Sequence, residues 1–256
     1  MRAWPPERVA HAAGARLAAS APRHEGPSRA VIDSREAGPG DLFVGLAGEH
    51  ADGGRFAAQA LAQGAWGVLV APDHVAGAGD GVVIAAGEPL AALGRLARAW
   101  RRELGAQVAG ITGSVGKTST KDLLAAMLAQ RLATVANQQN WNTEIGLPLT
   151  ILAAPAGTQA LVLEMGMRGV GQIAELAAIA EPDAGVITAI GPVHLELMGS
   201  IEAIAAEKAA LIGGLRRGGT AVVPADEPLL EPHLRDDVRT VRFGPGGDVD
   251  ALPGTL

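Results

Sequence analysis

The chain has 256 residues, a formal net charge of −6 and 48% apolar residues. This length fits one large domain or two modest ones with an ample core, and a mildly negative chain without a basic cluster argues against a nucleic-acid partner. The absence of cysteine excludes disulfides, thiolate catalysis and cysteine-bound metals, and it fits a reducing cytosol. No apolar run is long enough to span a membrane, and the N-terminus lacks the apolar core of a signal peptide.

The first third of the chain has the pattern of a small α/β unit. A short helix is expected over residues 5–13, followed by strands at 29–32, 42–46, 66–70 and 81–84. An apolar stripe from Phe56 to Leu61 predicts a helix that Gly64 ends. A longer helix over 90–104 follows. We place a boundary near residues 87–89, which gives an N-terminal domain of 1–87 and a second domain of 88–256.

Beyond this boundary, strands alternate with helices. Strands are expected at 108–112, 133–136, 160–164, 184–190, 220–223 and 240–243, and helices begin near 119, 171, 200 and 226. This alternation predicts an α/β fold with a mostly parallel sheet and helices on both faces. In such folds, ligands bind at the carboxyl ends of the strands.

A glycine-rich turn joins the strand at 108–112 to the helix that follows it. Backbone N–H groups of such a turn converge on one point and attract phosphate. Lys117 adds a positive charge there, and the hydroxyl of Thr118 is suited to hold Mg²⁺. The strict P-loop has glycine where this chain has Ile111, so a glycine-rich turn with an incidental lysine is the alternative interpretation.

Two candidate metal ligands follow strands of this sheet. Glu164 ends an apolar strand, where a carboxylate is costly unless it is paired or bound to a cation. His194 follows the strand at 184–190, although Mg²⁺ prefers oxygen ligands. Taken singly, Glu164 can equally cap a turn, and a lone histidine can equally be a hydrogen-bonding loop residue.

Lys208 falls within the apolar stripe of the helix that Ser200 is expected to cap. Either it faces an acidic site or its stem packs while its ammonium reaches water. Asn140, Asn142 and Thr143 lie in a loop that can bind a polar substrate or simply build turns.

Together these motifs resemble the Mur ligase family, in order and over almost the whole chain. The ATP loop of that family, which also departs from the strict P-loop, is similar to residues 112–121. Its N-terminal UDP-sugar domain is similar to Asp33-Ser-Arg35, Pro39-Gly-Asp-Leu-Phe43 and Asp52-Gly53. Residues 140–148, 164–173, 191–196 and 199–208 match further family segments, and the run Glu164-Met-Gly-Met-Arg-Gly169 is typical of the MurF branch.

The resemblance implies a cytoplasmic, ATP-dependent ligase of peptidoglycan synthesis. In this branch, ATP phosphorylates the terminal carboxylate of UDP-N-acetylmuramoyl-tripeptide, and the amine of D-alanyl-D-alanine attacks the acyl phosphate. ATP and Mg²⁺ are the implied cofactors, and we expect a monomer without nucleic-acid binding or membrane insertion.

Matching positions then receive roles. ATP contacts are implied for Thr112, Gly113, Ser114, Val115, Gly116, Lys117, Thr118 and Ser119. The implied metal ligands are Thr118, Glu164, His194 and, if it is carbamylated, Lys208. Catalytic roles fall to Lys117, His194 and Lys208. Substrate contacts are implied for Ser34 and Arg35, at the nucleotide-sugar. Asn140 and Asn142 would lie near its peptide or the phosphates, and Thr143 is a further substrate-binding position.

Several positions depart from the family pattern. Thr143 replaces an asparagine, Gln172 replaces a glutamate, and Ala210 stands where an acidic residue is common. The sequence also stops before the family's C-terminal domain, so we expect a truncated chain with weak or absent ligation. Three alternative functions remain open. They are a sister Mur ligase that adds one amino acid, a non-catalytic nucleotide- or UDP-sugar-binding fragment, and a plain P-loop NTPase. The last would leave Asp33-Ser-Arg35 and an inward Lys208 unexplained.

Overall fold

The structure is a computed structural model that describes residues 1, 3–20, 25–48, 51–138, 140–193 and 195–250. It divides into two compact units. Unit 1 comprises residues 1–104 and 148–157, and unit 2 comprises residues 105–147 and 158–256. Within the described residues, no helix is both long and apolar enough to cross a membrane.

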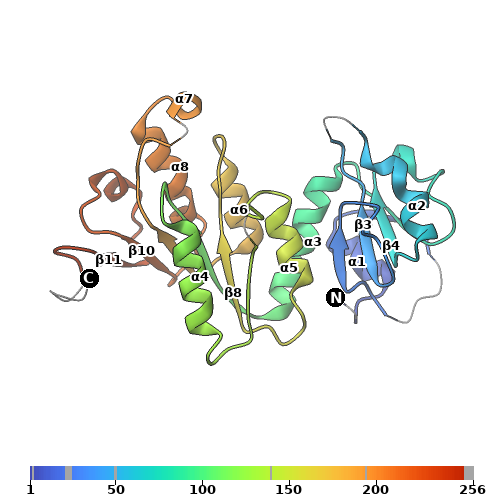
Figure 1. The fold of residues 1–256 in the computed structure, drawn as a ribbon, viewed down its shortest axis with the longest axis horizontal. Helices are drawn as coiled ribbons and strands as arrows, with labels where there is room; N and C mark the ends of the chain where they lie inside the picture. Colours follow the sequence, from blue (N-terminus) through green and yellow to red (C-terminus); the bar gives the residue numbers. More distant parts are fainter. Residues whose placement is uncertain (2, 21–24, 49–50, 139, 194, 251–256) are drawn as a thin grey trace. The chain divides into compact units, whose positions relative to one another are not determined.

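Unit 1 is built on a five-stranded sheet in the order β1-β5-β4-β3-β2 (Figure 1). Only the β1–β5 pair is antiparallel. The strands are β1 (Arg16–Ala19), β2 (Arg29–Val31), β3 (Asp41–Val44), β4 (Gly67–Val70) and β5 (Val82–Ala85), and the helices are α1 (Pro6–Ala12), α2 (Ala57–Ala62) and α3 (Pro89–Leu104). Short 3-10 helices cover Gly53–Phe56 and Pro72–His74.

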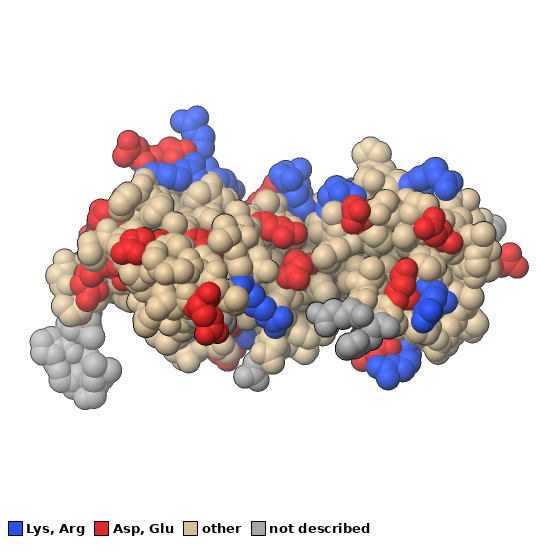
Figure 2. Space-filling view, turned by 90° about the horizontal axis from the view of Figure 1, so that it is seen from above, with Lys and Arg blue, Asp and Glu red and all other residues tan. Residues whose placement is uncertain are grey.

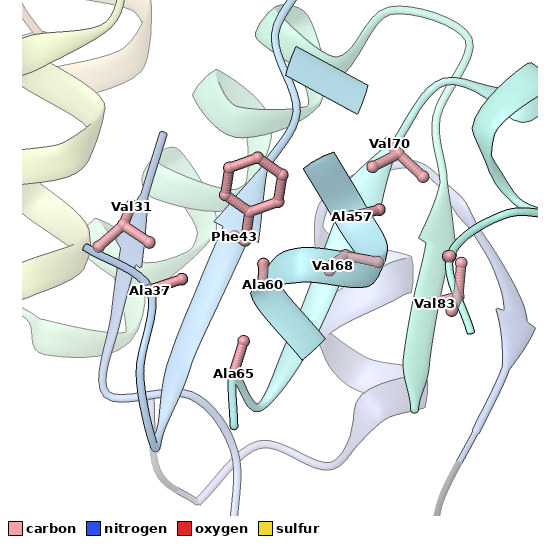
Figure 3. Packing of buried hydrophobic residues seen from close by; sticks show 10 residues of the cluster. Val31, Ala37, Phe43, Ala57, Ala60, Ala65, Val68, Val70 and Val83 are labelled. Atoms are coloured by element: carbon pink, nitrogen blue, oxygen red, sulfur yellow. The ribbon is translucent and has the colours of Figure 1, made fainter. Parts of the chain in front are cut away.

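The core of unit 1 forms where α2 packs on this sheet. Figure 3 shows Ala57 and Ala60 of α2 beside Phe43, Val68 and the other apolar side chains of this cluster. Strands β3, β4 and β5 are buried along their whole length, as expected for parallel strands covered on both faces. Small alanines on the helix let it lie close to the larger side chains of the strands.

Unit 2 contains a six-stranded parallel sheet in the order β11-β10-β9-β6-β8-β7. Its strands are β6 (Gln107–Thr112), β7 (Thr134–Ala136), β8 (Ala160–Glu164), β9 (Ala184–Ile187), β10 (Thr220–Pro224) and β11 (Arg239–Phe243). The helices are α4 (Lys117–Leu128), α6 (Gln172–Ala180), α7 (Leu195–Met198) and α8 (Ile201–Gly213), and a 3-10 helix covers Pro228–His233. The helix α5 (Gly146–Ala153) begins in unit 2 and ends in unit 1.

Glycines in the central strands decide which helix covers which face of this sheet. A Cβ atom at Gly110 or Gly185 would meet the side chain of Leu211, so α8 approaches that face closely. Neighbouring residues of a strand point to opposite faces, and Glu164 pairs in register with Ile111, next to Gly110. The side chain of Glu164 therefore lies on the other face, which α4 covers (Figure 1).

The predicted α/β fold with parallel sheets is confirmed, but several elements differ from the expectation. The antiparallel strand β1 and the helix α5 were not predicted, and the helix expected near 226 is a 3-10 helix. The strand predicted at 184–190 ends at Ile187, and α4 starts at Lys117 rather than near 119. Pro148 is compatible with α5 because it sits in the first turn, where its missing N–H has no helical partner.

Charged side chains of both signs lie next to one another on the face seen in Figure 2. This mixture agrees with the modest net charge of the whole chain.

Candidate functional site

The predicted phosphate-binding turn connects β6 to α4 and depends on two glycines. Gly116 has φ +83° and caps α4, and Gly113 has φ +147°, both in the region that favours glycine. A Cβ atom at Gly113 would also collide with the hydroxyl of Thr188. These backbone positions present the N-terminus of α4, a natural anion site, at the carboxyl edge of the sheet.

The segment after β9 holds this turn in place. Thr188 N–H donates to the carbonyl of Thr112 at 2.9 Å, and Ser114 N–H donates to the carbonyl of Ala189 at 2.8 Å. The Ser114 hydroxyl donates to the Gly191 carbonyl at 3.0 Å and accepts from its N–H at 2.8 Å. The predicted strand ends early because residues after Ile187 pair with the turn instead of continuing the ladder.

Lys117 is the first residue of α4, and its ammonium folds back onto the turn. Nζ donates to the carbonyl of Gly113 at 2.8 Å. The positive charge therefore lies over the same glycine-rich backbone that points toward the anion site. This is the position that a phosphate-binding lysine requires.

Glu164 lies at the centre of a polar cluster next to the turn. Its Oε2 accepts from the hydroxyl of Thr118 and its Oε1 accepts from Nδ2 of Asn142, each at 2.8 Å. Glu164 is 6% exposed, and no lysine or arginine of the described chain forms an ion pair with it. A buried carboxylate that accepts hydrogen bonds only from neutral donors carries an uncompensated negative charge, which a bound cation would neutralise.

Lys117 and Asn142 line a cleft of about 410 Å³ in unit 2. It brings together half of the site residues predicted for this unit, and adds side chains that the sequence did not single out. Its lining residues are Gly113, Ser114, Lys117, Asn140, Asn142, Thr143, Glu144, Met165, Gly166, Met167, Arg168, Gln172, Val193 and Lys208.

Lys208 reaches this cleft from α8, which Ser200 caps by accepting the N–H of Ala203 at 3.1 Å. Lys208 is 2% exposed, so its ammonium does not extend into open solvent. Burial, helped by the nearby charge of Lys117 and opposed by Glu207, lowers the pKa of Lys208 from 10.5 to about 8. The lowered pKa favours the uncharged, nucleophilic form of this amine more than in a solvent-exposed lysine.

The residues predicted for the UDP-linked substrate are in unit 1. Ser34 is 7% exposed and its hydroxyl contacts Oε1 of Gln59 at 3.4 Å. Arg35 pairs with Asp33 through Nε at 2.9 Å and remains exposed, and this pairing lowers the pKa of Asp33 to about 2. In a nearby loop, Asp52 accepts from Gly54 N–H at 2.9 Å and contacts Nε2 of His74 at 2.7 Å.

Comparison with known proteins identifies the family. Residues 111–252 match the Mur ligase middle domain, and residues 30–101 match the domain described as "Mur ligase family, catalytic domain". The chain belongs to the Mur ligase family. The resemblance that the sequence motifs indicated is therefore confirmed.

Similar relatives of this family carry one enzyme name. The UDP-N-acetylmuramoyl-tripeptide–D-alanyl-D-alanine ligase of Bacillus subtilis is 41% identical over 218 residues, which is 85% of this chain and 48% of that protein. The protein of the same name from Mycobacterium tuberculosis is 41% identical over 252 residues, with coverages of 88% and 48%. The chain thus spans about half the length of the curated relatives it matches.

Solved MurF structures share the fold. MurF from Acinetobacter baumannii superposes with a TM-score of 0.87 at 28% identity, covering 98% of this chain and 55% of that one. MurF from Thermotoga maritima in complex with ADP gives a TM-score of 0.79 at 35% identity, with coverages of 86% and 51%.

Two of the three positions that depart from the Mur ligase pattern, Gln172 and Thr143, make local hydrogen-bonding contacts. Gln172 Oε1 accepts from the backbone N–H of Arg168 and Gly169, at 2.5 and 3.1 Å, as a glutamate oxygen could. Thr143 Oγ1 contacts Gly146 N–H at 3.4 Å at the start of α5. Near Ala210, the acidic residue of α8 is Glu207, which accepts from the N–H groups of Gly171 and Ile173 at 2.7 and 2.8 Å.

Not every predicted position of the Mur ligase site lines the cleft. Thr118 and Glu164, which are hydrogen-bonded to each other, are not among its lining residues. His194 lies outside the described residues. Thr112 is fully buried at the end of β6, whereas Val115 is 65% exposed and Ser119 is exposed on α4.

Sequence reasoning also missed residues that build the site. Arg168 and Met167 line the cleft. Asn137 accepts a hydrogen bond from the backbone N–H of Glu164, and Lys121 donates to the backbone carbonyl of Asn137. Asn137 directly follows a strand, and a polar residue at that position was the available signal.

Proposed function

We propose that this chain is the substrate- and nucleotide-binding part of an ATP-dependent ligase that joins D-alanyl-D-alanine to UDP-N-acetylmuramoyl-tripeptide. In this proposal, residues 1–87 form the UDP-sugar domain, with Ser34 and Arg35 as substrate contacts, and residues 88–256 form the nucleotide domain. The names of the relatives that are about 40% identical to the chain support this assignment.

The observation that carries the proposal is the convergence of three groups at the carboxyl edge of the unit 2 sheet. Lys117 lies on the glycine-rich turn, Thr118 and Glu164 share a hydrogen bond, and Lys208 lines the same cleft. Phosphoryl transfer depends mainly on positioning and on neutralising charge. A cleft with two lysines beside a buried carboxylate offers both.

Oxygen donors in this cluster fit Mg²⁺. The Thr118 hydroxyl and the Glu164 carboxylate are adjacent hard ligands, and a nucleotide supplies the remaining oxygens in sites of this type. Over the described ranges, no group of three or more His, Cys, Asp or Glu residues forms a complete protein cage, which agrees with that arrangement. When bound, Mg²⁺ would neutralise the phosphate charge.

The other residues then have defined tasks. The N-terminus of α4 and Lys117 would bind the β- and γ-phosphates of ATP. Asn140, Asn142 and Thr143 would contact the UDP-linked peptide, whose carboxylate accepts the γ-phosphoryl group while ADP leaves. The amine of D-alanyl-D-alanine then forms the amide bond as phosphate departs. Lys208, once carbamylated, would present oxygen atoms to a second cation, together with His194.

Calorimetric titration of the chain tests this proposal. We expect a non-hydrolysable ATP analogue to bind in the presence of Mg²⁺, and UDP-N-acetylmuramoyl-tripeptide to bind more tightly than the corresponding dipeptide. Phosphate release that requires ATP, the tripeptide and D-alanyl-D-alanine would establish ligation. Tighter binding of a shorter peptide would favour a sister Mur ligase, binding without turnover would favour a non-catalytic module, and no nucleotide binding would refute the proposal.

A further inference from the structure

Asn137 follows β7 and is 2% exposed, and its carboxamide makes three hydrogen bonds. Oδ1 accepts from the backbone N–H of Glu164 at 2.8 Å, and Nδ2 donates to the backbone carbonyl of Glu164 at 2.9 Å. Nδ2 also donates to the carbonyl of Trp141 at 2.9 Å. Asn137 thus connects the last residue of β8 to the loop that precedes α5.

The carboxamide of Asn137 extends the sheet beyond the end of a strand. The β7–β8 ladder ends with Ala136 paired to Val162, so Glu164 has no backbone partner from β7. A carboxamide carries one donor side and one acceptor side, as a peptide group does. Asn137 therefore satisfies both backbone groups of Glu164 after the neighbouring strand has turned away.

The same residue links the two sides of the Glu164 carboxylate. Asn142, which donates to Oε1, directly follows Trp141, whose carbonyl is bound by Asn137. On the other side, the buried Lys121 donates from Nζ to the carbonyl of Asn137 at 2.8 Å. Lys121 is three residues after Thr118 on α4, so the two side chains lie on the same face of that helix.

We propose that Asn137, supported by Lys121, is a positioning residue that fixes the Glu164 carboxylate and Asn142 for binding of the metal–nucleotide complex. This inference rests on the proposed function for its cation. It adds to that function a residue that lies outside the phosphate turn and whose carboxamide binds only backbone groups of the chain. Groups of this kind hold a ligand in one orientation, and their loss typically weakens metal affinity about 10–100-fold.

The variant Asn137→Asp tests this positioning role. Aspartate keeps the size of the side chain and can accept from Glu164 N–H, but it has no donor for the carbonyls of Glu164 and Trp141. We expect ADP affinity in Mg²⁺ to fall about 10–100-fold, while ADP affinity in EDTA stays unchanged. The matched control is Gln138→Ala, an exposed neighbour in the same loop, which should bind as the wild type does. Equal affinity of Asn137→Asp and wild type, or an equal loss in Mg²⁺ and in EDTA, would overturn the inference.

A second measurement does not depend on nucleotide. Of the four tryptophans, only Trp141 lies in unit 2; it is 42% exposed, whereas Trp4, Trp66 and Trp100 are at most 4% exposed. Iodide quenching of fluorescence therefore reports on Trp141. We expect Asn137→Asp to increase the quenching constant because the loop is released, and Gln138→Ala to leave it unchanged.

These two measurements keep the inference and the proposed function separable. If wild-type protein binds no nucleotide, the proposed function fails, and quenching alone then decides whether Asn137 holds the loop; unchanged quenching overturns that claim. If Asn137→Asp does not fold, Lys121→Met replaces it, because this variant retains the apolar stem and removes the donor to the Asn137 carbonyl. It also removes the ion pair with the exposed Asp122, and Asp122→Asn is the control for that loss. The same increase in quenching and the same Mg²⁺-specific loss are expected for Lys121→Met.

Discussion

Replacing Glu164 by glutamine should make the ligand-free protein more stable and the ligand-bound protein less stable than wild type. The carboxylate is buried and accepts two neutral hydrogen bonds, from Thr118 and Asn142. A glutamine fits the same space, because its oxygen can accept from Asn142 and its NH₂ group can donate to the Thr118 hydroxyl, which is also an acceptor.

The magnitude follows from two opposing terms. Two charge-assisted hydrogen bonds become neutral ones, which costs about 1 kcal/mol each. Removing a buried charge that has no cationic partner stabilises the folded state by several kcal/mol, because the desolvation cost of that charge disappears. We therefore expect a net gain of about 1 kcal/mol in the free energy of unfolding, or about 2–4 °C in the melting temperature of a chain this size.

Bound ligand reverses the order of stability of wild type and Glu164→Gln. A ligand at 100 times its Kd stabilises the wild type by about 2.7 kcal/mol. If glutamine weakens metal-dependent binding about 100-fold, the same ligand concentration stabilises the variant by only about 0.4 kcal/mol. The wild type should then melt above the variant.

Differential scanning fluorimetry with and without an ATP analogue and Mg²⁺ measures both effects. Glu175→Gln, at an exposed position of α6, is the control and should follow the wild type in both conditions. A clear loss of stability of ligand-free Glu164→Gln would show that the carboxylate is not an uncompensated charge. Full retention of the ligand-induced shift would show that it does not hold the cation.

Four further predictions concern unit 2. Lys117→Ala removes the ammonium from the turn and should weaken binding of the ATP analogue by about 1.5–3 kcal/mol, measured by calorimetry; wild-type affinity would exclude Lys117 from the phosphate site. Burial lowers the pKa of Lys208 to about 8 in the folded chain, whereas the ordinary value of 10.5 applies to the unfolded chain. Between these two pH values the unfolded state binds more protons, so the free energy of unfolding should rise as pH increases from about 8 toward 10.5. Urea titrations measure this rise, and Lys208→Met should remove it. The same neutral amine should react with ¹³CO₂ to give a carbamate signal in NMR at pH 8, and persistence of that signal in Lys208→Met would assign it elsewhere. Ser200→Ala deletes the cap of α8 and should lower stability by about 1 kcal/mol, whereas an unchanged melting temperature would show that the cap is dispensable.

The sequence alone determined the class of fold and the position of the phosphate turn. The turn is a local feature: an apolar strand, glycines at 113 and 116, and Lys117 at the start of a helix lie within a few residues of one another. The apolar strands and their alternation with helices likewise follow from short-range patterns. For the same reason, the sequence singled out Glu164 as a candidate site residue, since a charge at the end of a buried strand requires an explanation.

Tertiary structure decided what short-range patterns do not contain. The strand β1 has no clear apolar alternation and exists through its antiparallel pairing with β5, and α5 contains a glycine and a proline that suggest a loop. The role of Asn137 depends on Glu164, 27 residues away. The lowered pKa of Lys208 depends first on its burial in the folded chain and then on Lys117 in another helix. Hydrogen bonds and electrostatic interactions act through space, so the groups that hold this site together became visible only when the sheet had brought the ends of its strands side by side.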